Sequence, residues 1–444
     1  MVKKFIAAMC ICLAHVAIAQ NAATQANVAT IDLDLDKAIE LALADNPTIW
    51  VADKEIELKQ VANEEAWQNL LPNLSANLSL QHSIQVAAIK TAMGEFKMGM
   101  DGSTTAVGGL ALNLPIFAPA VYQNMKLTKE DIQLAQEKAR GSRLDLINQV
   151  TKAYYSVLLA KDSRDVMQRS LKVAEENYET VNNMYEVGRA SEYDRLSADV
   201  QKRSMNSALI SAQAGLELAT LQLKVLMGVT ENIGFYITDN LNNYKDKLTV
   251  EDSGSLALEL DNNTNLRQLD MNVSLLQRAR RIMNSNFIPT IGFQATYQYQ
   301  SYSNDHWNIF KYKYSPSSTV AFSVSIPIFT ASNWTKLKTN TIQQAQLRDT
   351  RDYTRNQLAI AVESYRSNML SSVAQVESNL IAIEQADKAV AISSKRYEIG
   401  NGTILELNQS ETALTQAQLT YNQSIYEYLT NKADLDYTLG RGVL

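Results

Sequence analysis

Apolar and polar residues alternate in four short segments of this 444-residue chain. In the first segment, Leu74 and Leu78 fall on one side of the alternation and Ser75 falls on the other. A period of two residues is typical of a β-strand with one apolar and one polar face. Each segment has about the length of a tilted membrane-spanning strand, ~9–11 residues. We therefore expect four strands in two hairpins, at about 72–116 and 289–328.

Long helices are expected to follow these hairpins. Proline is absent from residues 120–288 and 328–444, and proline is the residue that most strongly interrupts helix interiors. One helix is predicted at about 118–187, on the order of 100 Å long at about 1.5 Å per residue, with a counterpart after the second hairpin. Further helices are expected at about 48–70, 190–227, 256–286 and 403–438.

The predicted helices carry an apolar stripe that indicates coiled-coil packing. In the last of them, an apolar or aromatic residue stands at every seventh position. A repeat of seven residues keeps one face of a helix against its partner over many turns. The residues of this stripe are Leu407, Leu414, Tyr421, Tyr428 and Leu435.

The two halves of the chain contain similar short sequence motifs at the same spacing. "LNLPIF" corresponds to "VSIPIF", and "YEVGRAS" corresponds to "YEIGNGT". Pro115 precedes Gly188 by 73 residues, and Pro327 precedes Gly400 by the same 73 residues. We therefore interpret the chain as an internal duplication.

Each Tyr-acid-apolar-Gly word is predicted to be the turn between two antiparallel helices. Gly188 and Gly400 fit the position just after a helix, where a left-handed backbone favours glycine. Ser191 and Thr403 fit the N-cap of the returning helix. An acid follows each cap three residues later, as in a capping box: Asp194 and Glu406.

Residues 1–19 have the pattern of a secretory signal peptide. Lys3 and Lys4 precede a short apolar run that ends in small residues. Cys10 and Cys12, the two cysteines of the chain, lie within it. We therefore expect a mature chain without disulfides, thiol nucleophiles or thiolate metal ligands, and we predict no lipid anchor.

Charge and composition argue against several classes of function. The 41 Lys and Arg residues, less the two in the signal peptide, leave 39 against 47 acidic residues, a net charge of −8. A mildly acidic chain is a poor binder of nucleic acid. We find no Ser-His-Asp set, glycine-rich phosphate loop or cluster of metal ligands. We therefore expect no enzyme activity, no cofactor and no metal.

Four strands with an apolar outer face require further chains. In lipid, the two open edges of such a sheet would leave backbone groups unpaired. Two copies supply eight strands, a barrel filled by its own side chains, and three copies supply twelve, enough to enclose a lumen. The helices are over three times as long as a bilayer is thick, so they must project from the barrel as a coiled-coil cylinder. Such an assembly is a duct.

This pattern resembles the TolC-type outer membrane efflux proteins over nearly the whole mature chain. The resemblance rests on the duplicated "PIF" words, the "YEVG" and "YEIG" turns and the helix lengths between them. It implies an α+β membrane protein, a homotrimer with a 12-stranded β-barrel in the outer membrane of a Gram-negative bacterium and a periplasmic α-helical tunnel. It also implies an exit duct for efflux or type I secretion. Its partners would be a periplasmic adaptor (membrane fusion protein) and an inner-membrane pump of the resistance-nodulation-division or ABC type.

The resulting organisation has six parts. Two repeats, each with a helix, a hairpin, a long helix and a returning helix, are joined by a linker that the resemblance places around the tunnel's equator. The parts are a signal peptide (1–19), an N-terminal segment (20–47), repeat 1 (48–228), the equatorial linker (229–254), repeat 2 (255–440) and a C-terminal tail (441–444).

The resemblance assigns Asp194 and Glu406 to the tunnel mouth. In the family, an acid six residues after the turn glycine faces the tunnel near its periplasmic end, where a ring of such acids attracts cations. The alternative is that each acid only caps its helix, and the sequence leaves both roles open. A second family acid, three positions later, is replaced here by Ser197 and Gln409, so strong cation trapping is not expected.

Tyr397 matches a family tyrosine that helps to latch the two helical hairpins together. By resemblance its partner is Asp194. The family's arginine two residues after the turn glycine is Gly402 here, and Arg189 lies in the other hairpin. The latch is therefore a hypothesis that rests on Tyr397.

Two further groups complete the candidate residues. The resemblance makes the turns the contact with the adaptor: Val187, Gly188, Arg189, Ala190, Ser191, Ile399, Gly400, Asn401, Gly402 and Thr403. Aromatic residues beside the strands are expected at the membrane interface: Phe117, Tyr122, Phe329 and Trp334. For Trp334, packing between helices is an alternative.

A second class of function stays open at this point. The chain could be an exported structural or adhesive coiled-coil protein without channel activity. The alternating strands argue against it, because a coiled coil needs none. An ordinary one-chain porin is excluded, since four strands are too few for a barrel.

Overall fold

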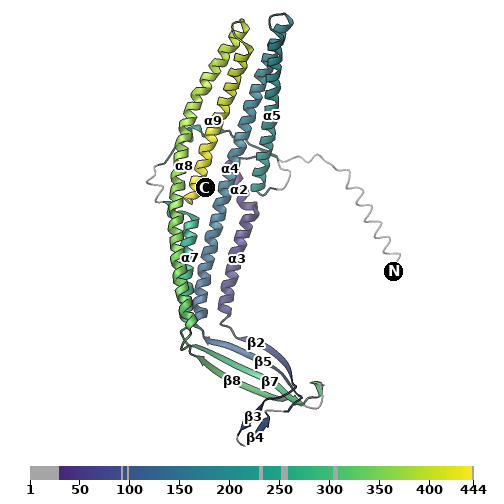
Figure 1. Cartoon of the computed structure of the whole chain (residues 1–444), viewed down its shortest axis with the longest axis vertical. Helices are drawn as coiled ribbons and strands as arrows, with labels where there is room; N and C mark the ends of the chain where they lie inside the picture. The colour runs from purple at the N-terminus through teal and green to yellow at the C-terminus, as the bar shows by residue number, and fades with distance from the viewer. Residues whose placement is uncertain are drawn as a thin grey trace, which may run out of the picture.

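The computed structural model describes residues 30–91, 94–97, 100–229, 234–251, 259–303 and 309–442, so the expected signal peptide lies outside the described residues. The molecule is elongated, with a sheet at one end and the tips of two helical hairpins at the other (Figure 1). Within the described ranges, no helix is both long enough and apolar enough to cross a membrane.

The sheet has four antiparallel strands in the order β2-β5-β7-β8. Its central pair, β5 and β7, joins the first half of the chain to the second, and β2 and β8 form its edges. All four alternating segments are strands, although the last ends at Ser325, before the expected end at 328. The strands are β2 (Asn73–Ser83), β5 (Ser103–Phe117), β7 (Thr290–Ser303) and β8 (Ser315–Ser325).

The apolar face of the sheet is exposed in the single chain. Leu78 of β2 is 91% exposed, and Phe322 of β8 is 71% exposed. Because no described helix covers these side chains, this face requires an apolar partner outside the chain.

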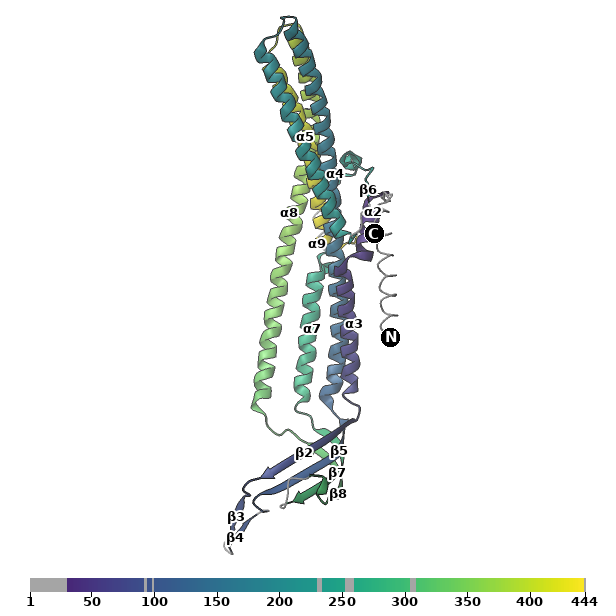
Figure 2. The same ribbon diagram turned by 90° about the vertical axis from the view of Figure 1, so that its right-hand side faces the viewer.

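Two helices of 68 residues run from the sheet to the tips, α4 (Pro119–Glu186) and α8 (Ala331–Glu398). Near the sheet, α3 (Pro47–Gln68) and α7 (Thr264–Ser285) lie beside them, and near the tips α5 (Glu192–Leu226) and α9 (Ile404–Thr438) do (Figures 1 and 2). The prediction at 256–286 began the helix too early. The side chain of Asn263 accepts hydrogen bonds from the backbone N–H groups of residues 265 and 266, which sets the start of α7 at Thr264.

Each returning helix ends on the first turn of a shorter helix. The Asn46 side chain, which caps α3, donates a 2.8 Å hydrogen bond to the Leu226 carbonyl at the end of α5. In the second half, Asn263 donates a 2.7 Å bond to the Thr438 carbonyl at the end of α9. These bonds use helix-end carbonyls that would otherwise lack a partner.

A small layer lies beside the middle of the helical part, on one side of it (Figure 2). It contains β1 (Thr30–Asp32) paired in parallel with β6 (Gly234–Tyr236), together with α2 (Leu35–Asp45), η1 (Leu241–Lys247) and η2 (Leu260–Asn262). The sequence analysis predicted none of these elements. Within the first hairpin loop, the short ribbon of β3 (Ala88–Thr91) and β4 (Gly94–Lys97) was also missed, so the expected total of four strands was too low. The second hairpin loop contains η3 (Ile309–Lys311).

The main apolar core lies at this middle level. Tyr154 and Leu158 of α4 and Ile425 and Tyr428 of α9 are at most 1% exposed. The equatorial segment is tied to this core by Lys161 Nζ, which donates 2.7 Å hydrogen bonds to two carbonyls, those of residues 237 and 239. The two long hairpins are therefore anchored at their middle.

Candidate functional site at the hairpin tips

The two tips end in the same backbone motif. Gly188 has φ +75° and Gly400 has φ +79°, a left-handed conformation that favours glycine. At the first tip, the Arg189 N–H donates to the Met184 carbonyl at 2.7 Å, and the Gly188 N–H donates to the Tyr185 carbonyl at 2.9 Å. This pair of hydrogen bonds is a Schellman motif. The second tip has the same pair. The prediction that both glycines terminate helices is confirmed.

Both returning helices begin with a capping box. The Ser191 hydroxyl accepts a 3.1 Å hydrogen bond from the Asp194 N–H, and the Asp194 carboxylate accepts a 3.0 Å bond from the Ser191 N–H. Thr403 and Glu406 make the same exchange at 3.2 and 3.4 Å. The cap role of the two acids is therefore confirmed. Their role at a tunnel mouth stays a prediction.

An apolar cluster holds the two tips together. Val181, Ala198, Ile404 and Leu407, from α4, α5 and α9, are at most 2% exposed. Tyr178, Ala190 and Tyr397 pack around them. The tip of one hairpin is thus packed against the other within a single chain.

Tyr397 occupies a dry position in this cluster. Its hydroxyl oxygen is buried and has no hydrogen-bond partner. Burial raises the pKa of the Tyr397 hydroxyl, and the nearby negative charge of Asp194 raises it further. The pair therefore lies close together, as the resemblance implied, without the hydrogen bond of a latch. The latch itself stays a prediction.

Arg396 provides a charge partner that the sequence analysis missed. Its guanidinium lies 3.8 Å from the Glu406 carboxylate and donates a 3.1 Å hydrogen bond to the Asn401 carbonyl. The family arginine that Gly402 replaces has no counterpart two residues after the glycine. Arg396 instead reaches the turn from the preceding helix, four residues before Gly400.

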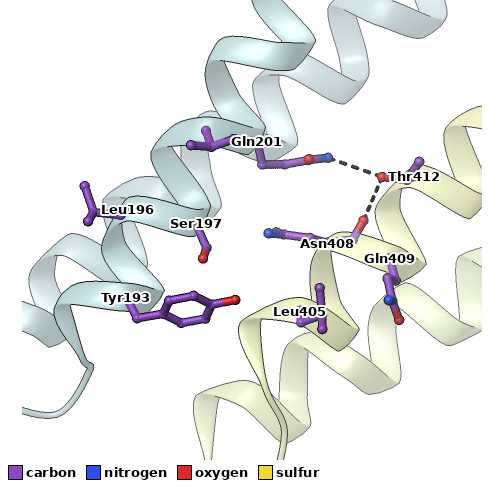
Figure 3. Close-up of a pocket in the computed structure, with 9 residues that line it drawn as sticks. Tyr193, Leu196, Ser197, Gln201, Leu405, Asn408, Gln409 and Thr412 are labelled. Carbon is purple, nitrogen blue, oxygen red and sulfur yellow. Dashed lines mark hydrogen bonds between the residues drawn. The ribbon is translucent and has the colours of Figure 1, made fainter.

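A groove separates α5 from α9 just behind the tips (Figure 3). It has a volume of about 540 Å³, and Gln201 spans it with a 3.4 Å hydrogen bond to Thr412. Ser197 and Gln409, which stand where the family has its second acid, both line it. The other lining residues are Tyr193, Leu196, Val200, Leu405 and Asn408.

The outermost tip residues and the expected interface aromatics are exposed, whereas Ala190 and Gly402 of the tips are partly buried. Val187 and Ile399, the outermost apolar residues of the two tips, are 70% and 69% exposed.

The four expected interface aromatics lie where the sheet meets the helices, and all are at least 40% exposed. Trp334 contacts the Phe287 ring at 5.3 Å between centroids yet remains 62% exposed. The four are Phe117, Tyr122, Phe329 and Trp334. Across the described residues, no group of three or more His, Cys, Asp or Glu side chains could hold a metal ion.

Two named proteins are similar in sequence to this chain along most of its length. The chain is 22% identical to the outer membrane protein TolC of Vibrio cholerae serotype O1 over 343 residues, which are 73% of this chain and 75% of that protein. It is 20% identical to the cobalt-zinc-cadmium resistance protein CzcC of Cupriavidus metallidurans over 412 residues, which are 92% of this chain and 90% of that protein.

The fold is shared with solved outer membrane channels. The structure of CusC superposes with a TM-score of 0.75 at 17% identity, covering 95% of this chain and 96% of that one. The family model described as outer membrane efflux protein matches residues 38–229 and again 256–441. These two matches span more than half of the chain. The chain therefore belongs to the outer membrane efflux protein family, which consists of channel proteins of the Gram-negative outer membrane.

Proposed function

We propose that this protein is the outer-membrane exit duct of a tripartite efflux or type I secretion system. It conducts substrates passively from a periplasmic adaptor and an inner-membrane pump to the exterior. The observation that carries the proposal is the sheet, which is open at both edges and exposes an apolar face. Membership of a family of channel proteins, as opposed to enzymes, supports it.

A homotrimer closes this sheet. The strands alternate in direction from β2 to β8, so β8 of one copy meets β2 of the next in an antiparallel pair. Three copies give twelve strands with no edge, and every backbone group in the lipid is then paired. The exposed apolar side chains face lipid, and the aromatic residues at the sheet–helix junction lie at the membrane interface.

The helices also have a face that needs a partner. On α5, exposed apolar residues recur at intervals of three and four residues near both ends of the helix. Such a stripe on a long helix favours packing against a second coiled coil. In the proposed trimer, that partner is a helix of the neighbouring copy. The stripe consists of Tyr193, Leu196, Val200, Ile210, Leu218, Leu221 and Val225.

Internal duplication accounts for the equal lengths of corresponding helices. The pairs α3 and α7, α4 and α8, and α5 and α9 have 22, 68 and 35 residues in each half. The two separate family matches support the same division into repeats at 48–228 and 255–440. In such a trimer the two repeats of each chain would therefore occupy nearly equivalent places.

The tips are the end that meets the pump assembly. In the proposed orientation the helices project into the periplasm, and the exposed turns at 187–191 and 399–403 contact the adaptor. An inner-membrane pump of the resistance-nodulation-division or ABC type completes the system.

Removal of the tip acids tests the duct and its mouth together. We expect Asp194→Ala and Glu406→Ala to raise single-channel conductance in a planar bilayer and to lower the preference for cations several-fold. A carboxylate contributes on the order of 1 kcal/mol to holding a nearby cation in water, and each chain contributes both acids to the ring. The Glu406 variant also frees Arg396 from its ion pair.

Two controls separate charge from helix capping. Asp194→Asn removes the charge but keeps an acceptor for the Ser191 N–H, so it should lower cation preference like the alanine variant. Glu384→Ala removes an exposed acid of α8 that pairs with Lys388, and it should leave conductance unchanged. A parent protein that forms no ion-conducting pore would refute the duct and favour the exported coiled-coil protein.

A further inference from the structure

Glu411 is a carboxyl group at a core position of the helical part. It stands on α9 between Leu407 and Thr415 in the stripe that faces α4, where neighbouring positions bury Ile, Leu and Tyr side chains. Only 8% of the residue is exposed. A glutamate this deeply buried is rare unless it is paired with a positive charge.

Its hydrogen-bond partner lies on the other hairpin. The Asn177 side-chain amide of α4 donates to the Glu411 carboxylate. One heptad along α4, Ser170 shares a 2.8 Å hydrogen bond with Thr415 of α9. The contact between the two hairpins therefore contains a polar layer between the tip cluster and the equatorial core, where a coiled coil is expected to be apolar.

A cavity of about 240 Å³ adjoins this layer, between α4, α5, α8 and α9. The charged groups that line it with Glu411 are Arg169 of α4 and Asp387 of α8. The residues that α5 contributes, Gln201 and Met205, carry no charge. No ion pair with Glu411 occurs within the described part of the chain, so its ionised form lacks a directly paired positive charge.

Burial raises the pKa of Glu411 to about 7, although the hydrogen bond from Asn177 lowers it in part. If the hairpins part, the carboxyl is hydrated and its pKa returns toward the ordinary value of 4.5. The packed arrangement is therefore favoured fully below the ordinary pKa. It is progressively weakened as the pH rises through the higher value of the packed state.

We propose that Glu411 is a proton switch between the two helical hairpins, which pack together when it is protonated and part when it is ionised. The acid lies 11 residues after Gly400, roughly 16 Å along the helix from the tip. A change of packing at this layer is therefore transmitted to the tips as a change in their separation. A role of this switch in regulating the duct rests on the proposed function. The change in packing itself does not depend on that function.

Distance measurements between spin labels test the switch. The expected mature chain has no cysteine, so V187C and I399C place one label on each exposed tip. The labelled protein in detergent, diluted with unlabelled chains, is measured by double electron–electron resonance from pH 5 to pH 8. The ratio of long to short distances should rise at least about tenfold, because each unit by which burial raises the pKa corresponds to a factor of ten.

Three variants make the test specific. Glu411→Gln should keep the short distance at every pH, with unchanged helical content. Asn177→Ala removes the donor that favours the ionised carboxylate and should move the transition to higher pH. Glu384→Gln, a change at an exposed acid, should behave like the parent protein.

The outcomes distinguish this proposal from the proposed function. A parent protein whose distances do not change with pH, or a Glu411→Gln variant that keeps the parent's response, would overturn the switch. If the distances respond to pH but conductance does not, the switch holds and the gate assigned to the tips is wrong.

Discussion

Replacement of Gly440 by alanine is expected to destabilise the protein by about 3 kcal/mol, as backbone strain and a steric clash add together. Gly440 has φ +69°, and its N–H donates to the Tyr437 carbonyl at the end of α9. A Cβ atom at this position would lie 2.3 Å from the Asn262 carbonyl oxygen, immediately before the Asn263 cap of α7. Because the obstacle is backbone, the junction between α9 and α7 would have to shift.

The matched control is Gly188→Ala at the first tip. Gly188 has nearly the same backbone conformation, φ +75°, yet a Cβ atom there would meet nothing within 4 Å. Only the conformational cost remains, about 1 kcal/mol. The measurement is the thermal midpoint of the helical circular dichroism signal in detergent. Equal losses in the two variants would contradict the account of the α9–α7 junction.

Replacement of Arg441 by methionine is expected to cost about 2 kcal/mol, between the values for exposed and buried ion pairs. The guanidinium donates two hydrogen bonds to Glu259, at 2.6 and 2.8 Å, and two to Glu251, at 2.9 and 2.8 Å. It also lies 3.4 Å from Asp436 of α9. Arg441 thus joins the end of the second repeat to the chain that connects the repeats. Arg441→Lys keeps the charge but loses the paired geometry, so an intermediate loss is expected.

The contacts of Arg441 also predict how the stability of the protein depends on pH in the acidic range. The hydrogen bonds from Arg441 lower the pKa of Glu251 and of Glu259 below the ordinary value of 4.5. Their stabilisation is therefore present above that pH and is lost as the pH falls through the lowered values. Asp436 acts in the opposite sense, because burial raises its pKa. Thermal midpoints measured from pH 7 to pH 3 should fall less steeply in Arg441→Met than in the parent. An equally steep fall would contradict the assignment.

Long-range periodicity made the main elements predictable. The helix expected at 118–187 is Pro119–Glu186, because no proline interrupts it and Gly188 ends it. The four strands were predicted from alternation alone. An equatorial linker was expected at 229–254 from the resemblance, but the elements of this layer were not predicted, since the parallel pair β1–β6 joins three-residue strands from distant parts of the chain. Strands this short carry no period that sequence reasoning could detect.

The turns, caps and acids of the tips were predictable, but the basic partner of Glu406 was not. The caps at Ser191 and Thr403 follow from residue types at fixed offsets. Arg396 was missed, because its approach to Glu406 depends on how the helix enters the turn. Glu411 was missed because the apolar stripe was counted at every seventh residue, from Leu407 to Leu414, which passes over the position between them. The sequence did hold one indication of this site. Glu411 follows Leu407 by four residues, so it falls on the same face of the helix as the apolar stripe.

Cysteine cross-linking in isolated outer membranes tests the central claim, that three copies close the sheet into a barrel. One cysteine is placed at Asn77 in β2, and a second is moved along β8 from Ser317 to Val324. Neighbouring antiparallel strands bring Cα atoms to about 4.5–5.5 Å, within reach of a disulfide. The account predicts that one short stretch of β8 yields a covalent product of three chains. Failure of every position to link, or a product limited to two chains, would contradict it.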